Sequence, residues 1–223
     1  LRLHQWLKNT LVLLPLVLAH ELTNTGLFLQ ALLAFLSFGL CASSVYVLND
    51  LLDLPSDRQH YSKRLRPLAS GEIPLLTGLL ISPALLVMSF ALANQLPQAF
   101  IIILGVYYLC TGFYSFVLKR IMLVDVIMLA ALYTLRIIAG AAAIDVAVSF
   151  WLLLFSMFIF LSLALIKRYS ELKVARDAGK SGALRGRGYE PDDLELVSSL
   201  GGSAGFIAVL VLALYIQDGQ AAH

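Results

Sequence analysis

The feature that most constrains this sequence is a series of apolar stretches, each close to the length of a membrane-crossing helix. Crossing the hydrocarbon core takes roughly 20 mostly apolar residues, and backbone hydrogen bonding inside lipid leaves only helices or closed barrels. The stretches are too long for barrel strands, so we expect helices. The predicted helices cover residues 8–20, 27–50, 74–94, 98–118, 122–143, 147–172 and 192–217. The first is short, with Trp6 as a candidate interfacial anchor.

The composition agrees with a membrane protein. The 223 residues are 60% hydrophobic and 13% charged, whereas a soluble domain is about half apolar and about a quarter charged. No polar stretch is long enough to enclose a separate water-soluble core, so we expect one transmembrane domain over residues 1–223. The predicted fold class is an all-α, polytopic transmembrane helix bundle with about seven spanning helices.

The positions of Lys and Arg indicate the orientation of these helices. Short cytoplasmic loops carry an excess of Lys and Arg. In this sequence, cations precede the first predicted helix and follow the second, fourth and sixth, whereas the opposite connections contain only acidic charges. With seven helices in alternation, all the basic loops fall on one face. We expect that face to lie in the cytoplasm.

A polar segment that directly follows the second apolar stretch combines acids with cations. Its charged side chains are Asp50, Asp53, Asp57, Arg58, Lys63, Arg64 and Arg66. Mg²⁺ prefers oxygen ligands and usually binds through one or two carboxylates together with substrate phosphates. The cations would hold other phosphate oxygens, the arginines with bidentate geometry. A solvated loop would explain the cations but not the acids, so we favour a site for Mg²⁺ and a diphosphate.

Helical geometry brings the acids of this segment together. Asp50 and Asp53 lie about 60° apart around an ideal helix, so both carboxylates project from one face. Pro55 lacks a backbone donor and clashes with the preceding turn, which predicts a kink or break near Leu54. A new turn would then bring Asp57 back toward the other two.

A second polar cluster lies at the end of the sixth predicted helix. It consists of Lys167, Arg168, Tyr169 and Glu171, and Lys167 and Glu171 are one turn apart. Taken alone, a helix end with snorkelling cations is the simpler interpretation. Its location on the same predicted membrane face as the first cluster favours a binding role. The following segment, 173–191, is predicted to be a glycine-containing loop that could cover a site.

A third set of polar residues surrounds the fifth predicted helix. The connection before it supplies Tyr114, Lys119, Arg120 and Asp125. Arg136 lies inside the helix, where a charge is costly, marks a functional site by default and faces the bundle interior. Substrate binding and pairing with a structural carboxylate are equally compatible with this position. Lys8 and Asn9, where the first predicted helix begins, could face the same cavity, and a simple interfacial anchor is an equally good interpretation of the two residues.

Several other features have simpler explanations. Gly201 and Gly205 in the last predicted helix have the small-xxx-small spacing of close helix packing, and Gly39 with its small neighbours invites the same interpretation. The basic loops lack an interleaved aromatic platform, so we expect no nucleic-acid binding.

The charged segments resemble motifs of a known family. The resemblance to the UbiA superfamily of membrane prenyltransferases rests on the motif Asn49-Asp50-x-x-Asp53-x-x-x-Asp57-Arg58 followed by Lys63-Arg64-x-Arg66-Pro67-x-Ala69-Ser70-Gly71. The branch that contains decaprenyl-phosphate phosphoribosyltransferase is similar in His4-Gln5-Trp6-x-Lys8-Asn9, in Tyr114-Ser115 to Lys119 with Asp125, Arg136 and Gly140, and in Lys167-Arg168-Tyr169-x-Glu171-Leu172.

This resemblance implies a funnel-like bundle of usually nine helices in a bacterial plasma membrane, with a cavity open to lipid and two polar motifs at its cytoplasmic mouth. Family members usually carry a second aspartate-rich motif after the sixth helix. This chain has Lys167, Arg168 and Glu171 there, which favours the phosphoribosyl branch. The chain reaches His223 after seven predicted helices, so we expect the last two family helices to be missing.

In that branch the resemblance implies that the phosphate of a polyprenyl phosphate attacks the anomeric carbon of 5-phosphoribosyl diphosphate and releases diphosphate. The implied partners are an isoprenoid lipid, a diphosphate-bearing substrate, membrane lipids and Mg²⁺, with no oligomeric state indicated. Asp50, Asp53 and Asp57 are the candidate catalytic and metal-binding residues. The candidate substrate-binding residues are Lys8, Asn49, Arg58, Lys63, Arg64, Arg66, Tyr114, Lys119, Arg136, Lys167, Arg168 and Glu171.

Two alternatives stay open at the level of sequence. In the first, a prenyl diphosphate ionises at the same metal site and alkylates an aromatic or other acceptor. In the second, the protein is a transporter or scaffold with a charged cytoplasmic mouth. A transporter would be favoured by inverted repeats or by charges spread along a membrane path, and the sequence displays neither.

Overall fold

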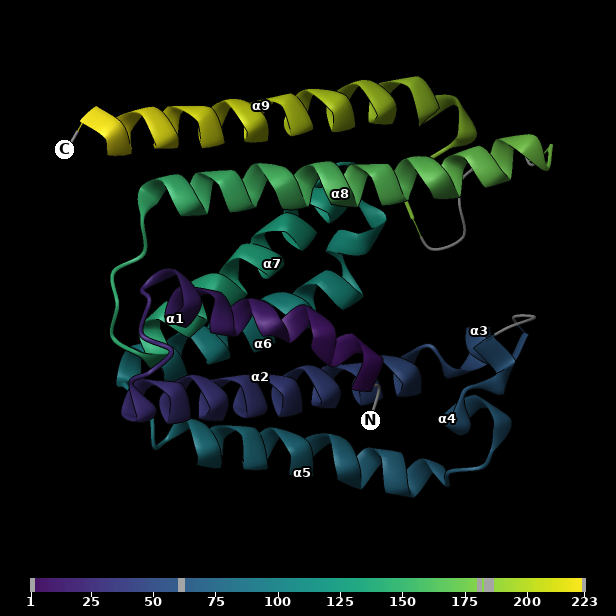
Figure 1. Ribbon diagram of the computed structural model, residues 1–223. Helices are drawn as coiled ribbons and strands as arrows, with labels where there is room; N and C mark the ends of the chain where they lie inside the picture. Colours follow the sequence, from purple (N-terminus) through teal and green to yellow (C-terminus); the bar gives the residue numbers. More distant parts are fainter. Residues whose placement is uncertain (1–2, 60–62, 180–181, 183–186, 222–223) are drawn as a thin grey trace. The chain divides into compact units, whose positions relative to one another are not determined.

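The structure is a computed structural model that describes residues 3–59, 63–179, 182 and 187–221. Every regular element in these residues is helical (Figure 1), which confirms the all-α prediction. Among the described residues, six helices are long and apolar enough to cross a membrane. They are α2 (Thr25–Leu52), α5 (Leu75–Ala93), α6 (Gln98–Phe116), α7 (Val124–Ala143), α8 (Phe150–Asp177) and the span Pro191–Asp218, which begins in η4 (Pro191–Asp193) and continues in α9 (Leu194–Ala221). These spans indicate an integral membrane protein.

The first predicted helix differs from the other six. It is a 3₁₀-helix, η1 (Leu3–Leu13), continued by a short α-helix, α1 (Leu14–Leu18). A 3₁₀-helix rises about 2.0 Å per residue and an α-helix about 1.5 Å, so the segment extends about 30 Å with fewer residues than an α-helix would need. That length is about the thickness of the hydrocarbon core.

The chain packs as two compact units. The first contains Leu1–Gly112 and Arg136–Val146, and the second contains Phe113–Leu135 and Ala147–His223. The first unit also holds the short helices α3 (Leu54–Gln59), η2 (Lys63–Leu65) and α4 (Pro67–Ser70), and the second holds η3 (Leu118–Arg120). The prediction of one domain over the whole chain stays a prediction.

In the first unit, α2 and α5 lie side by side (Figure 1). Two reciprocal pairs of serines join the two helices. Ser37 Oγ donates to the carbonyl of Ser89 over 2.9 Å, and Ser89 Oγ donates back to the carbonyl of Ser37 over 2.7 Å. Ser44 and Ser82 repeat the exchange over 2.7 and 3.0 Å. Small side chains let the helix backbones approach closely, and each hydroxyl finds a partner inside the apolar layer.

Trp6 packs inside the first unit. Its indole N–H donates to Ser43 Oγ over 3.1 Å, and its ring stands edge-on to Phe35. A Cβ atom at Gly39 would lie 3.1 Å from the indole. The small residues of α2 therefore serve packing, as predicted, and they receive Trp6, for which we had suggested an interfacial position.

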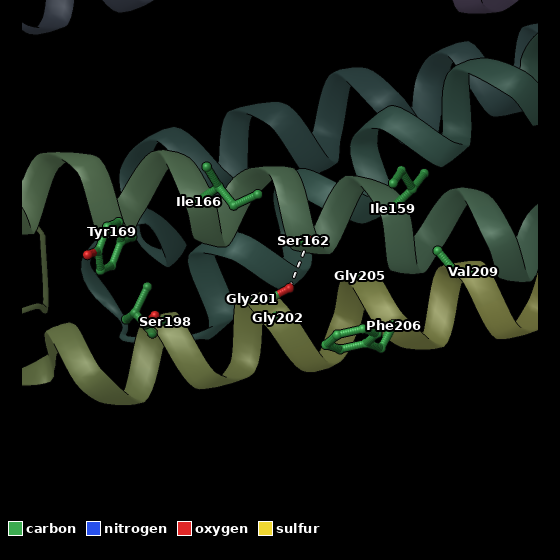
Figure 2. Close-up of a pocket in the computed structure, with 11 residues that line it drawn as sticks. Ile159, Ser162, Ile166, Tyr169, Ser198, Gly201, Gly202, Gly205, Phe206 and Val209 are labelled. Atoms are coloured by element: carbon green, nitrogen blue, oxygen red, sulfur yellow. Dashed lines mark hydrogen bonds between the residues drawn. The ribbon is translucent and has the colours of Figure 1, made fainter.

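In the second unit, α8 and α9 form a long antiparallel hairpin, drawn in green and yellow in Figure 1. Ser162 Oγ donates to the carbonyl of Gly201 over 2.8 Å. A Cβ at Gly201 would lie 3.3 Å from Leu165 Cβ, and one at Gly205 would lie 3.2 Å from Ser162 Oγ. The predicted close helix packing at these glycines is confirmed. An apolar groove of about 510 Å³ lies along this pair. Figure 2 shows Gly201 and Gly205 among the residues that line it.

Helix α8 runs five residues further than the predicted 147–172 and ends at Asp177. Nothing in the sequence after 172 breaks a helix until Gly179, which adopts a left-handed conformation with φ of 64°. Glycine is the residue that most readily ends a helix in this way. The cationic end of α8 is therefore a rigid helix rather than part of the loop.

Candidate functional site

The acidic segment of the first unit is shaped by the predicted helix break. Asn49 and Asp50 lie in the last turn of α2, which ends at Leu52 with Asp53 as its cap. Helix α3 begins at Leu54, directly before Pro55. The prediction of a break near Leu54 is confirmed.

Arg66 connects two of the three acids. Its Nη1 atom donates to Asp50 Oδ1 over 3.0 Å and to Asp57 Oδ2 over 2.5 Å. The Asp57 side chain is 1% exposed and the Arg66 side chain 27% exposed, so the buried carboxylate is neutralised by a cation that reaches the surface. Arg66 has extended backbone at the start of α4, with Pro67 as the first helical residue, and this conformation turns its side chain back toward α3.

The carboxylates of this cluster are the type of ligand that a divalent ion such as Mg²⁺ prefers. Because both oxygens contact one nitrogen, at 3.0 and 2.5 Å, they are at most about 5.5 Å apart. Two oxygens on one Mg²⁺, each at about 2.0–2.1 Å, lie at most about 4.2 Å apart. Among the described residues, no three His, Cys, Asp or Glu side chains are yet gathered at metal-binding distance. A metal would have to replace Arg66 between Asp50 and Asp57.

The other predicted substrate-binding residues differ from one another in how exposed their side chains are. Asn49 is half-buried, and Arg58 and Arg64 are exposed. The side chain of Lys63 lies outside the described residues. Lys8, on η1, is exposed, and Lys119, on η3 of the second unit, is half-buried.

Arg136 lies in the interior of the first unit, as predicted, and is 5% exposed. Its Nε atom donates to Asn9 Oδ1 over 3.1 Å and its Nη2 atom to the hydroxyl of Tyr107 over 2.9 Å. Its guanidinium lies 5.6 Å from the centre of the Phe38 ring. One turn later, a Cβ at Gly140 would lie 2.0 Å from the Val12 carbonyl, so only glycine permits this approach to η1. Asn9 therefore faces Arg136, as we had suggested.

The second polar site is centred on Asp125, which lies at the start of α7. The side chain of Asp125 is fully buried. Its Oδ2 atom lies 2.8 Å from Arg168 Nη2 and 3.2 Å from Arg187 Nη1, and its Oδ1 atom accepts a hydrogen bond of 2.5 Å from the hydroxyl of Tyr189. A buried carboxylate is costly unless it is paired and hydrogen-bonded. Two arginines and a tyrosine meet that requirement here.

Arg168 is enclosed by this network. It is 1% exposed, its Nη1 atom donates to Glu171 Oε2, and its guanidinium lies 5.4 Å from the centre of the Tyr189 ring. Its neighbour Lys167 is exposed. Of the two predicted phosphate-binding cations of α8, Lys167 is therefore the accessible one, whereas Arg168 organises the cluster with Glu171.

Tyr189 remains protonated in this environment. Burial, and after it the hydrogen bond to the Asp125 carboxylate, raises the pKa of Tyr189 well above its ordinary value. Its oxygen also accepts a hydrogen bond of 3.0 Å from the Leu123 amide. The hydroxyl thus donates one hydrogen bond and accepts another, and both link the loop after α8 to the start of α7.

Arg187 and Tyr189 had no predicted site role, and Asp125 was predicted only as one of the polar residues before the fifth helix and as part of a motif. The signal was present: Asp125 begins an apolar helix and requires buried partners. The partners come from the loop 62 and 64 residues away, a pairing that no local spacing rule reveals. Part of that loop, predicted as a cover, lies outside the described residues.

Comparisons with known proteins found relatives of this chain. An uncharacterized protein, y4nM, of Sinorhizobium fredii is 38% identical over 97% of this chain and 42% of its own length. Decaprenyl-phosphate phosphoribosyltransferase of Mycolicibacterium smegmatis is 35% identical over 80% of this chain and 57% of its own length. The chain thus spans about half the length of these curated relatives.

A solved structure of a UbiA homolog from Archaeoglobus fulgidus bound to GPP and Mg²⁺ superposes with a TM-score of 0.67, at 22% identity, over 83% of this chain and 65% of that one. This similarity confirms the predicted fold. The UbiA prenyltransferase family matches residues 10–217 of the 223. The chain therefore belongs to the UbiA prenyltransferase family.

Proposed function

We propose that this protein is a Mg²⁺-dependent membrane transferase that moves the 5-phosphoribosyl group of 5-phosphoribosyl diphosphate to a polyprenyl phosphate. The proposal takes its substrates from the phosphoribosyltransferase relative, which is 35% identical. The observation that carries it is the pairing of Asp50 and Asp57 on the single nitrogen of Arg66. This pairing holds two carboxylates at a separation that a divalent ion could close.

The residues of the first cluster have separate roles in this proposal. Asp50, Asp53 and Asp57 would hold Mg²⁺, which, when bound, neutralises charge that grows on the leaving diphosphate. Arg66 would leave the carboxylates as the metal arrives. Its guanidinium could then bind phosphate oxygens, for which its planar fork is suited. The acids and the arginine would exchange partners, so no buried charge would be left unpaired.

The cluster at the end of α8 would bind a phosphate group. Lys167 is exposed and can offer up to three donors. Glu171 fixes Arg168 rather than an incoming ligand. A phosphate nucleophile is already ionised near neutral pH, so no general base is required to activate it.

The proposal includes location and lipid partners. We propose that the protein lies in a bacterial plasma membrane with its acidic segment and the cationic end of α8 on the cytoplasmic side, following the distribution of Lys and Arg. The isoprenoid tail of the acceptor would remain in the apolar layer among the spanning helices. The bilayer would thereby supply the lipid substrate directly.

The test is incorporation of label into lipid. Purified protein in detergent is incubated with Mg²⁺, labelled 5-phosphoribosyl diphosphate and polyprenyl phosphate, and in parallel with Mg²⁺, labelled prenyl diphosphate and an aromatic acid. We expect a labelled lipid only in the first mixture and only with Mg²⁺. Product only in the second mixture would establish prenyl transfer instead, and no Mg²⁺-dependent product in either would refute an enzyme.

Variants test the residue assignment separately. Asp50→Ala and Asp53→Ala should each lower turnover at least about 100-fold, because loss of a group that stabilises developing charge typically costs that much. Asp218→Ala, at the other end of the long hairpin, makes the same chemical change to an exposed acid and should retain activity. Full turnover in Asp50→Ala would remove Asp50 from the metal site.

A further inference from the structure

The segment Arg187–Gly188–Tyr189 is fixed to the residues before and at the start of α7 by three successive contacts. Tyr189 bonds to Asp125 and to the Leu123 amide. At Gly188 a Cβ would lie 2.4 Å from the Arg120 carbonyl, so the backbone is held too close for any other residue. This backbone placement lets the side chain of Arg187 also reach the carboxylate of Asp125.

The two arginines on Asp125 differ in how tightly they are held. Arg168 is 1% exposed and lies 2.8 Å from Asp125, a full-strength charge-assisted contact. Arg187 is 27% exposed and its three contacts are longer: 3.2 Å to Asp125, 3.4 Å to the hydroxyl of Tyr114 and 3.9 Å to Glu171. Arg187 therefore keeps both solvent access and unused hydrogen-bonding capacity.

The cluster also lacks an acceptor. Nε of Arg168 is buried and has no hydrogen-bond partner among the described residues. The carboxylates of Asp125 and Glu171 balance the two arginines, and Lys167 adds one more positive charge beside them in the chain. An anion is the ligand that this excess of donors and charge favours.

We propose that Arg187 is a substrate-binding residue that contacts a phosphoryl group, and that Asp125 and Tyr189 are positioning residues that hold it. This inference rests on the proposed function, since it assigns Arg187 to the phosphate-bearing substrate of that reaction. Asp125 orients Arg187 through its Oδ2 atom, while Tyr189 fixes Asp125 through Oδ1. The arginine then exchanges its long contacts for short bidentate ones to phosphate oxygens.

The experiment compares Arg187→Gln, Arg187→Lys and Tyr189→Phe with Arg176→Gln, a control in which an exposed arginine paired to Glu195 loses the same charge. Binding of inorganic diphosphate, the KM for 5-phosphoribosyl diphosphate, kcat and the unfolding temperature are measured for each purified protein. Arg187→Gln should weaken diphosphate binding and raise KM at least about tenfold, the loss of one hydrogen bond to a charged group. Its unfolding temperature should match that of Arg176→Gln, and Arg187→Lys should recover part of the binding.

Two outcomes would overturn the proposal. One is diphosphate binding in Arg187→Gln that equals the wild type. The other is a loss of binding that only accompanies a fall in unfolding temperature as large as that of Tyr189→Phe, which would make Arg187 a structural residue. If the wild-type protein transfers no phosphoribose, the proposed function fails, and the diphosphate-binding measurement still decides the role of Arg187.

Discussion

The hydroxyl of Tyr189 lies 2.5 Å from Oδ1 of Asp125, and both side chains are completely buried. Tyr189 comes from the loop after α8 and Asp125 from the first turn of α7, so one hydrogen bond joins two distant parts of the sequence. Because the pKa of Tyr189 is raised, its hydroxyl keeps the proton it donates throughout the neutral range and above. Tyr189 therefore stays a hydrogen-bond donor to Asp125 over that range.

Removing this hydroxyl should destabilise the protein. Tyr189→Phe leaves the buried carboxylate with one donor fewer and the Leu123 amide without its acceptor, so we expect the free energy of unfolding to fall by about 1–3 kcal/mol. Denaturation in detergent measures the change. Tyr215→Phe makes the same substitution at a residue that is 49% exposed and should have almost no effect. Equal stability of the two variants would contradict a stabilising role of the Tyr189 hydroxyl.

A methyl group at Gly188 should displace the same loop. Its Cβ would lie 2.4 Å from a backbone oxygen, which cannot move aside like a side chain. Gly188→Ala should therefore lower the unfolding temperature and speed proteolysis between α8 and α9. Gly202→Ala is the matched control, because nothing lies within 4 Å of that Cβ and alanine is better than glycine in a helix by about 0.5–1 kcal/mol. If both variants are equally stable, the close approach is wrong.

Arg66 should compete with metal at the acidic segment. Because its cation lies between Asp50 and Asp57, Arg66→Gln should bind Mg²⁺ alone several-fold more tightly, as titration calorimetry measures. Arg66→Lys keeps the charge and should bind Mg²⁺ like the wild type. Arg176→Gln controls for the change in net charge. Unchanged or weaker Mg²⁺ binding by Arg66→Gln would contradict a shared site.

The serine pairs should couple α2 to α5. Ser44 and Ser82 each donate to the carbonyl of the other, so Ser44→Ala and Ser82→Ala should be non-additive. Membrane hydrogen bonds measured in this way average about 0.6 kcal/mol and reach about 1.7, which sets the expected coupling. Ser44→Ala combined with Ser89→Ala, taken from different pairs, should be closer to additive. Additive energies within the pair would mean that the hydrogen bonds contribute little.

The sequence predicted the helices well because their signal is local. Length and hydropathy located the six membrane-length helices of the part of the chain that the structure describes, and Pro55 marked the break before α3. Arg136 was correctly placed in the interior because a charge inside a span has to face other protein groups. The end of α8 was predicted five residues too early, at 172. The residue that ends the helix, Gly179, is nevertheless a local signal in the sequence.

The partners of the site residues could not be predicted in the same way. Arg168 is surrounded by Asp125, Glu171 and the Tyr189 ring, partners that the sequence did not reveal. Arg66 bridges two carboxylates, which the sequence did not reveal either. The expected contacts of both arginines with phosphate stay predictions. Each of these side chains could pair with several opposite charges, and only tertiary packing selects among them. The sequence shows that groups able to bind phosphate are present. It does not show which of these groups are already paired with carboxylates of the protein.

The most direct test of this account is the formation of a phosphoribosylated lipid by the purified protein. With labelled 5-phosphoribosyl diphosphate and polyprenyl phosphate, we predict a Mg²⁺-dependent labelled lipid that is lost in Asp50→Ala and Asp53→Ala and retained in Asp218→Ala. A wild-type protein that releases no diphosphate and labels no lipid in the presence of Mg²⁺, while remaining folded in detergent, would contradict it.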